Sequence, residues 1–170
     1  MKALIAICLV VSVGVLVLGA VTLLALALDK GADMTGQELG VMGELYVARQ
    51  LRAVGLDVQR SGPADLVADG LAVEVKAARA KPYKRGRKGY QYCLHKPGHT
   101  DHRRAAVVIL LAYWDSTSDP VAFVIPSERL GNRRKLTIPN RQPWLYAGKW
   151  ARYYRRWDVL ADVMEGAGDG

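Results

Sequence analysis

The pair Asp69-Gly70, set between two short apolar runs, is the feature that most limits what this chain can fold into. The runs occupy residues 66–68 and 71–75, and only Glu74 interrupts them. Asp and Gly both tolerate positive φ, as the two central residues of a tight hairpin turn must. The stretch therefore predicts two antiparallel strands joined at Asp69-Gly70.

This turn also fixes which side chains meet across the hairpin. Asp65 falls opposite Glu74, and Lys76 shares a face with Glu74, because strand side chains alternate. Two carboxylates that face each other across a ladder repel, but a cation between them removes the repulsion. Mg²⁺ binds one or two carboxylates and completes its shell with waters and substrate phosphate. The hairpin therefore predicts a small metal site with a lysine beside it.

A helix before the hairpin supplies another carboxylate. Thr35 and Glu38 form a capping-box pattern, which predicts a helix that begins there and ends near Gly55. Helical periodicity puts these apolar residues on one side: Val41, Leu45, Val47, Ala48, Leu51 and Val54. Glu44 lies near the middle of that stripe, where an ionised group needs a partner. Two partners are open, a basic residue at the edge of the core or the predicted metal ion.

The order of these residues resembles a known nuclease superfamily. A helical Glu44, then Asp65, then Glu74-Val75-Lys76 on adjacent strands is similar to the PD-(D/E)xK pattern, including small Holliday junction resolvase-like and intron-endonuclease-like members. The resemblance covers roughly residues 34–130, and Ala64 separates the Pro and Asp that the pattern places together. It implies an α/β fold with a restriction-endonuclease-like α-β-β-β-α-β core, whose mixed central sheet is flanked by helices.

The resemblance also implies the roles of the site residues. Asp65, Glu74 and the Val75 carbonyl would hold Mg²⁺, for which Mn²⁺ would substitute, and Glu44 would add a further contact. Lys76 would orient the attacking water or help to deprotonate it. In related nucleases a polar residue on the strand after Glu-x-Lys completes the site, and Gln91 is the candidate here.

The rest of the chain predicts further strands and one more helix. Residues 79–89 are rich in Lys, Arg and Gly and predict a loop. The predicted elements after it are strands at 90–94, 105–114, 121–126 and 135–139, a helical turn at 127–130 capped by Ser127, and a helix at 144–160 that docks on the core through its aromatic residues.

Basic residues are concentrated after the predicted metal site. The formal net charge is +8, and residues 76–96 contain eight basic residues and no acid. Such clusters are typical of proteins that bind the phosphate backbone, although an anionic membrane surface would also attract them. The candidate DNA contacts are Lys81, Lys84, Arg85, Arg87, Lys88, Arg103 and Arg104.

The N-terminal segment differs in composition from the rest. Residues 3–28 contain no charged residue, which is long enough for a transmembrane helix. We predict an uncleaved signal-anchor at 1–30, a nuclease-like domain at 31–165 in the cytoplasm, and a flexible tail at 166–170. Two alternatives are open: a signal peptide cleaved after Ala25-Leu26-Ala27, or translation from Met34, which would give a cytoplasmic protein. Cys8 and Cys93 form no disulfide framework.

The sequence therefore predicts a hydrolase, a metal-dependent endodeoxyribonuclease that cuts DNA phosphodiester bonds with an activated water. We expect DNA, the membrane and a second copy of the chain as partners. The alternative is a module of nuclease-like fold that binds DNA or an anionic membrane without catalysis.

Overall fold

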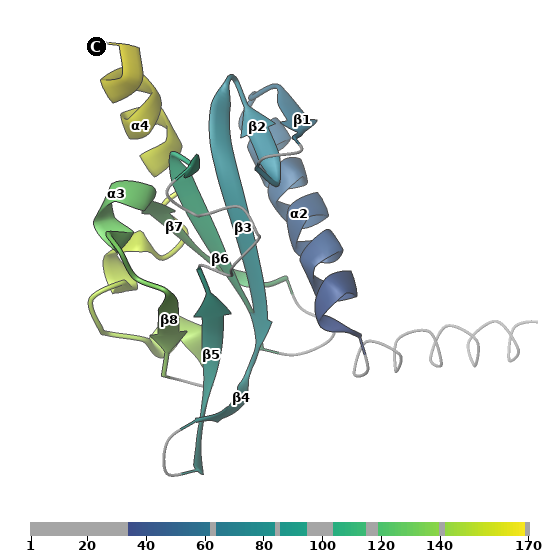
Figure 1. Cartoon of the computed structure of the whole chain (residues 1–170), viewed down its shortest axis with the longest axis vertical. Helices are drawn as coiled ribbons and strands as arrows, with labels where there is room; N and C mark the ends of the chain where they lie inside the picture. Colours follow the sequence, from purple (N-terminus) through teal and green to yellow (C-terminus); the bar gives the residue numbers. More distant parts are fainter. Residues whose placement is uncertain are drawn as a thin grey trace, which may run out of the picture. The chain divides into compact units, whose positions relative to one another are not determined.

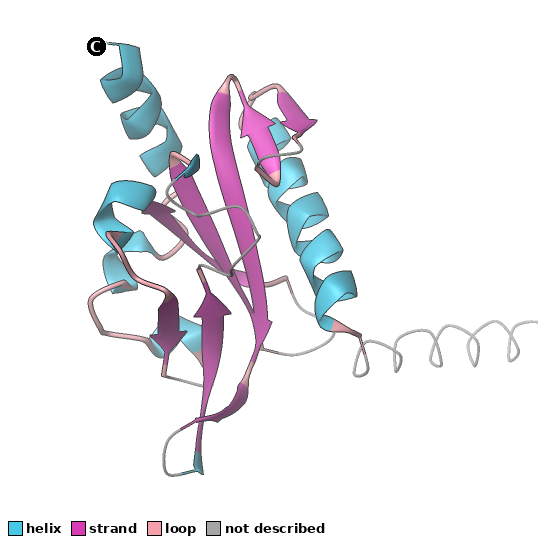
Figure 2. Ribbon diagram, viewed as in Figure 1, coloured by secondary structure: helices cyan, strands magenta, loops and turns pink. Residues whose placement is uncertain are grey.

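A computed structural model describes residues 34–61, 64–83, 86–94, 104–114, 119–139 and 142–168. The elements below all belong to one compact unit, Thr35–Gly170. In chain order they are α2 (Gly36–Ala53), β1 (Val58–Arg60), β2 (Leu66–Ala68), β3 (Leu71–Arg79), β4 (Lys81–Tyr83), β5 (Arg87–Cys93), β6 (Val107–Tyr113), β7 (Val121–Pro126), α3 (Ser127–Leu130), β8 (Lys135–Ile138), the 3-10 turns η4 (Pro143–Leu145) and η5 (Ala151–Tyr153), and α4 (Val159–Gly168) (Figures 1 and 2).

The strands form two sheets. The larger has the order β1-β2-β3-β6-β7, in which β3 and β6 are parallel and the other neighbours are antiparallel. The smaller has the order β4-β5-β8 and is antiparallel throughout. The predicted mixed α/β fold is therefore confirmed, with β8 at the edge of its sheet as expected. The second helix of the expected core order would fall between the predicted strands at 90–94 and 105–114, and residues 95–103 of that stretch lie outside the described residues.

The β2–β3 hairpin has the register that the sequence predicts. Ala68 pairs with Leu71, and the ladder continues to the pair Leu66–Val73. Asp69 and Gly70 have φ values of 45° and 82°, so both turn residues occupy the left-handed region. This conformation matches the right-handed twist of the two strands, which explains why the local sequence alone determines the pairing.

Helix α2 begins as predicted but buries a different face. Thr35 and Glu38 form the capping box, and the helix ends at Ala53, just before Gly55. The buried positions are Leu39, Gly43, Val47, Ala48 and Leu51, whereas Val41, Leu45 and Val54 are exposed. The predicted stripe was therefore wrong in half of its members. The reason is the close approach of the helix to the sheet at Gly43. A Cβ at this position would lie 3.1 Å from Leu111 Cδ1 and 3.2 Å from the Ala77 Cβ, so the face of the helix that carries Gly43 packs against the sheet.

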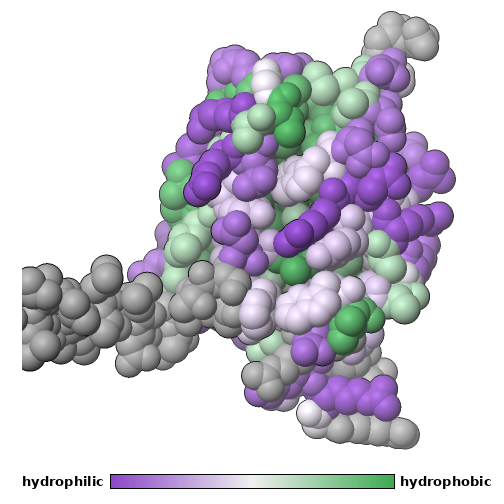
Figure 3. Space-filling model, turned by 180° about the vertical axis from the view of Figure 1, so that it is seen from behind, coloured by the Kyte–Doolittle hydropathy of each residue, from purple (hydrophilic) through white to green (hydrophobic). Residues whose placement is uncertain are grey.

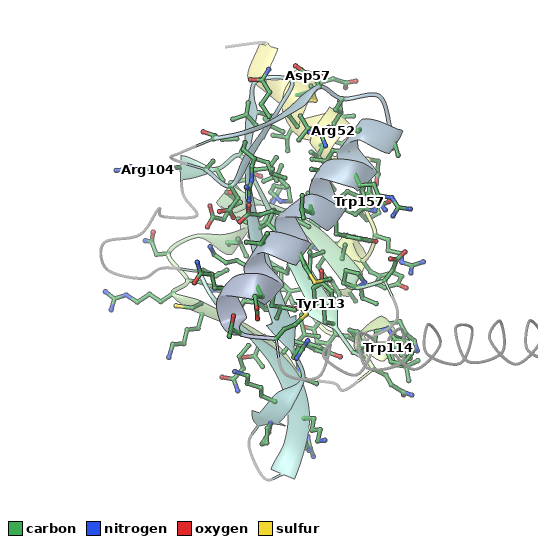
Figure 4. All side chains as sticks on the ribbon, turned by 90° about the vertical axis from the view of Figure 1, so that its right-hand side faces the viewer. Arg52, Asp57, Arg104, Tyr113, Trp114 and Trp157 are labelled. Carbon is green, nitrogen blue, oxygen red and sulfur yellow. The ribbon has the colours of Figure 1, made fainter. Side chains whose placement is uncertain are left out.

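Strands β6 and β7 form the centre of the core. From Val107 to Ala112 every β6 residue is 0% exposed, as expected for a strand covered on both faces. Helix α2 covers one side of the large sheet, and α4 lies on the other side (Figures 1 and 4). The predicted strands at 105–114 and 121–126 are therefore confirmed.

Two predictions about irregular segments were wrong. The predicted loop at 79–89 was wrong in its described residues, because β3 continues to Arg79 and residues 81–83 of β4 pair with residues 87–89 of β5. The ladder gives these polar residues backbone partners that their composition does not reveal. Ser127 does not cap α3, since Pro126 occupies the N-cap position and no side chain makes a capping hydrogen bond.

The C-terminal aromatic segment is also not the single helix predicted at 144–160. It forms η4 and η5, and α4 begins only at Val159 and continues to Gly168. Tyr154 makes a β-bridge with Phe123. Arg155 follows with a φ of 52° and donates its backbone N–H to Ala122 O. Pairing with the free edge of β7 therefore replaces helical hydrogen bonds.

Within the part of the chain that the structure describes, no helix has the length and apolar character needed to cross a bilayer. The predicted membrane helix at residues 1–30 lies outside that part.

Candidate active site

A cavity of about 580 Å³ opens where β2 stops pairing with β3. Its walls come from the first half of α2, the residue before β2, the middle of β3 and the end of β5. The sequence-predicted residues that line it are Glu44, Asp65, Val75, Lys76 and Gln91. Residues spread over almost 50 positions of the chain therefore meet at one place.

Asp65 occupies the edge of β3 that β2 leaves open. Its Oδ2 accepts a hydrogen bond of 2.7 Å from the backbone N–H of Val75. In a regular strand the N–H and C=O of one residue point to the same edge, because a hydrogen-bonded pair exchanges both bonds. The Val75 carbonyl therefore faces the same edge as Asp65, as its predicted role requires.

The environment of Asp65 shifts the pKa of its carboxyl group upward. Burial raises the pKa of Asp65 above its ordinary value, and the nearby Glu44 carboxylate raises it further. The hydrogen bond from Val75 and the positive charges of Lys76 and Arg60 oppose this shift without cancelling it. A carboxyl group with a perturbed pKa in a cavity is typical of functional sites.

Glu74 does not line the cavity itself, but it contacts Lys76, which does. Its side chain is only 3% exposed and forms an ion pair with the Lys76 ammonium, which is 28% exposed. Glu74 and Lys76 lie two residues apart on one strand, so both point to the same face, as the sequence predicts. The ion pair holds the lysine at the cavity wall.

Glu44 forms an ion pair of 2.5 Å with Arg60, the last residue of β1. This is one of the two partners that the sequence left open for Glu44. Arg60 itself was not predicted, since a basic residue at the end of a three-residue strand gives no local signal of a contact sixteen positions away. Because the Arg60 side chain is 64% exposed and that of Glu44 is 21% exposed, the pair borders solvent.

The donors at this cavity fit a hard divalent cation. Among the residues that the structure describes, no three His, Cys, Asp or Glu side chains form a ready-made metal group. Mg²⁺ does not need one, because one or two carboxylates suffice when waters and phosphate complete its shell. Asp65 and Val75 supply a carboxylate and a carbonyl oxygen at the cavity, whereas the Glu74 carboxylate does not line it and lies behind Lys76, with which it forms an ion pair. The carboxyl pKa raised by burial marks a place where a cation would be favourable.

Four of the predicted DNA contacts lie within the described residues. Lys81, Arg87, Lys88 and Arg104 are all exposed, and the Arg104 side chain points away from the body of the protein (Figure 4). Lys84, Arg85 and Arg103 lie outside the described residues.

No protein-family model matches the sequence, and neither does any curated protein. Among solved structures, the fold is similar to that of the bacterial homing endonuclease I-Ssp6803I, with a TM-score of 0.59. The two chains share a fold. The similarity covers 79% of this chain and 96% of the endonuclease, at 16% sequence identity.

Proposed function

We propose that this chain is a metal-dependent endonuclease that hydrolyses DNA phosphodiester bonds and follows the PD-(D/E)xK plan. One observation carries the proposal, the convergence on one cavity of the polar residues Glu44, Asp65, Lys76 and Gln91. Two further observations support it: the fold similarity to a homing endonuclease, and the exposed basic residues on β4 and β5.

Asp65, Glu74 and the Val75 carbonyl would hold Mg²⁺ or Mn²⁺, with Glu44 as an additional ligand directly or through water. When bound, the cation would lower the pKa of a coordinated water and stabilise the oxygens of an in-line displacement. Asp65 must be ionised for this role, and its raised pKa therefore predicts weaker metal binding as the pH falls.

The remaining residues would act on the water and the phosphate. Lys76 is held by Glu74 at the cavity wall, where its ammonium would orient the attacking water and neutralise the charge that develops on the phosphoryl oxygens. Gln91 is exposed at the same cavity and offers an amide donor and acceptor to orient the same groups.

The test compares the full-length protein with Asp65→Asn and Lys76→Ala on plasmid and branched DNA. We expect Mg²⁺-dependent cleavage in the wild type, and a rate at least about a hundredfold lower in each variant, in line with the loss of one stabilising group. Asp162→Asn is a matched control, because Asp162 is an exposed residue of α4. Unchanged cleavage in Asp65→Asn would contradict the site assignment.

A second candidate is a module that binds DNA or an anionic membrane without catalysis. The ion pair between Lys76 and Glu74 favours it, since a lysine held by a buried carboxylate also serves a purely structural role. Salt-sensitive binding to DNA or to liposomes, with no cleavage of any substrate, would support this candidate.

Membrane attachment through residues 1–30, a cytoplasmic domain and a homodimer remain proposals. Cell fractionation with protease accessibility tests the first two, and analytical ultracentrifugation of the purified protein tests the third.

A further inference from the structure

The β4–β5 hairpin projects from the body of the protein (Figures 1 and 3). Lys81 pairs with Gly89, and Pro82 pairs with Lys88, so the strands form a two-stranded antiparallel ribbon. Lys81, Pro82, Gly86, Arg87 and Lys88 are all exposed. The sequence contains no acidic residue between Glu74 and Asp101. The hairpin is therefore a basic ribbon whose two faces both meet solvent.

Residues that face each other in an antiparallel ladder point to the same side. Lys81 therefore shares one face with Arg87, and through the alternation of β5 this face continues to Gln91. Lys88 lies on the opposite face, which it shares with Tyr90 and the buried interior at the base of the ribbon. Cations thus extend from both faces of the projecting part.

The root of the ribbon is fixed to the body. A Cβ on Gly89 would lie only 2.8 Å from Ile138 O and 3.1 Å from Pro139 Cα, so β5 and the end of β8 are in close backbone contact there. From Gly89 to Arg87, the first residue of β5, the strand extends about 7 Å, at the usual rise per residue. The major groove of B-DNA is about 8.5 Å deep and admits a two-stranded ribbon. The free part of the ribbon therefore has the cross-section to enter the groove and a length close to the groove's depth.

The ribbon and the cavity share strand β5. Gln91 lines the cavity, and Arg87 lies four residues before it, about 14 Å away along an extended strand. We propose that the β4–β5 hairpin is a groove-binding arm that enters the major groove of double-stranded DNA beside the bond to be cut. This inference rests on the proposed function of the cavity and assigns it duplex DNA as the substrate class.

Two kinds of contact follow from this placement. Phosphates line both sides of the groove, and cations on both faces of the ribbon would meet them. Arg87 carries the planar donor group that binds guanine O6 and N7 on the floor of the groove. A single strand has no groove, so the arm predicts a preference for duplex DNA.

The test measures binding of the full chain, in EDTA, to a mixed-sequence 30-base-pair duplex and to its separate strands. A duplex of this length makes about three helical turns. The arm variant is Lys81→Ala/Arg87→Ala, and the matched control Arg49→Ala/Arg129→Ala removes the same charge from exposed residues of α2 and α3. We expect the arm variant to lose at least about tenfold in duplex affinity, and the control to lose less than about threefold.

Groove occupancy is tested with the same duplex methylated at guanine N7, which blocks the major groove, or saturated with netropsin, which fills the minor groove. We expect methylation to weaken wild-type binding about tenfold and to leave the arm variant nearly unaffected. Equal affinity for duplex and single strands, or inhibition by netropsin alone, would overturn the inference.

These results are separable from those for the cavity. Mg²⁺-dependent cleavage could be absent while N7 methylation still weakens binding of the wild type but not of the arm variant. In that case the nuclease proposal fails and the arm stands as a DNA-binding element. If cleavage occurs and the arm variant binds duplex like the wild type, the arm fails and the nuclease proposal stands.

Discussion

Replacing Lys76 with methionine would remove the ammonium partner of a buried carboxylate while keeping most of the length of the side chain. The Glu74 side chain is 3% exposed, so water cannot replace the lost charge. Removing one member of a buried ion pair typically costs about 3–5 kcal/mol. Because Lys76 itself is 28% exposed, we expect a value at the lower end, about 3 kcal/mol, for the fall in the free energy of unfolding.

The assay is urea denaturation followed by tryptophan fluorescence, applied to a double-mutant cycle with Glu74→Gln. In the double variant neither charge is present, so the loss should be smaller than the sum of the single losses by about 1–3 kcal/mol. Lys135→Met is the control, because Lys135 is an exposed lysine on a strand, at the start of β8. A Lys76→Met loss below about 0.5 kcal/mol, a value usual for surface sites, would refute the structural role of the pair.

Three further predictions concern other parts of the molecule. Thr35→Ala removes the capping box of α2 and should lower the free energy of unfolding by about 1 kcal/mol, measured by urea denaturation. Alkylation of Cys93, a half-exposed thiol at the cavity, should block cleavage, and Cys93→Ser should be resistant; continued cleavage by the alkylated wild type would contradict the site. Burial raises the pKa of Tyr113 to about 12, so its contribution to stability is complete below pH 10 and is lost as the pH rises towards 12. Denaturation at several alkaline pH values should therefore show a smaller fall in Tyr113→Phe than in the wild type.

Local sequence was enough to predict the parts of the site that depend on one turn. Asp69-Gly70 imposes positive φ at both positions, and this determines the register that brings Asp65 and Lys76 to one edge of β3. The alternation along β5 also predicted that Gln91 shares a face with Cys93, and both residues line the cavity. These relations hold without knowledge of the rest of the fold, because turn geometry and strand alternation are local.

Other features depend on contacts between distant segments, and the sequence did not reveal them. The rotation of α2 follows from the close approach of Gly43 to Leu111, which no periodicity within the helix indicates. The break in the C-terminal aromatic segment follows from the bridge between Tyr154 and Phe123. In each case tertiary packing outweighs the propensity of the local sequence.

The basic segment after β3 is a further case in which local composition did not predict the structure. Its Lys, Arg and Gly content indicates a loop, yet β4 and β5 pair there and β8 packs against Gly89. The charge of the segment agrees with the exposure of its described basic residues, but it gave no information about the shape of the segment. The ribbon geometry is what turns a general DNA contact into a proposal for the major groove.

The most direct test of the central claim is a time course of plasmid cleavage by the full-length protein in Mg²⁺, in EDTA, and in EDTA followed by excess Mg²⁺. We predict cleavage in the first reaction, none in the second, and full recovery in the third. Equal cleavage in EDTA would contradict a metal-dependent site at Asp65 and Glu74. The absence of cleavage in all three, with DNA binding intact, would contradict the nuclease function itself.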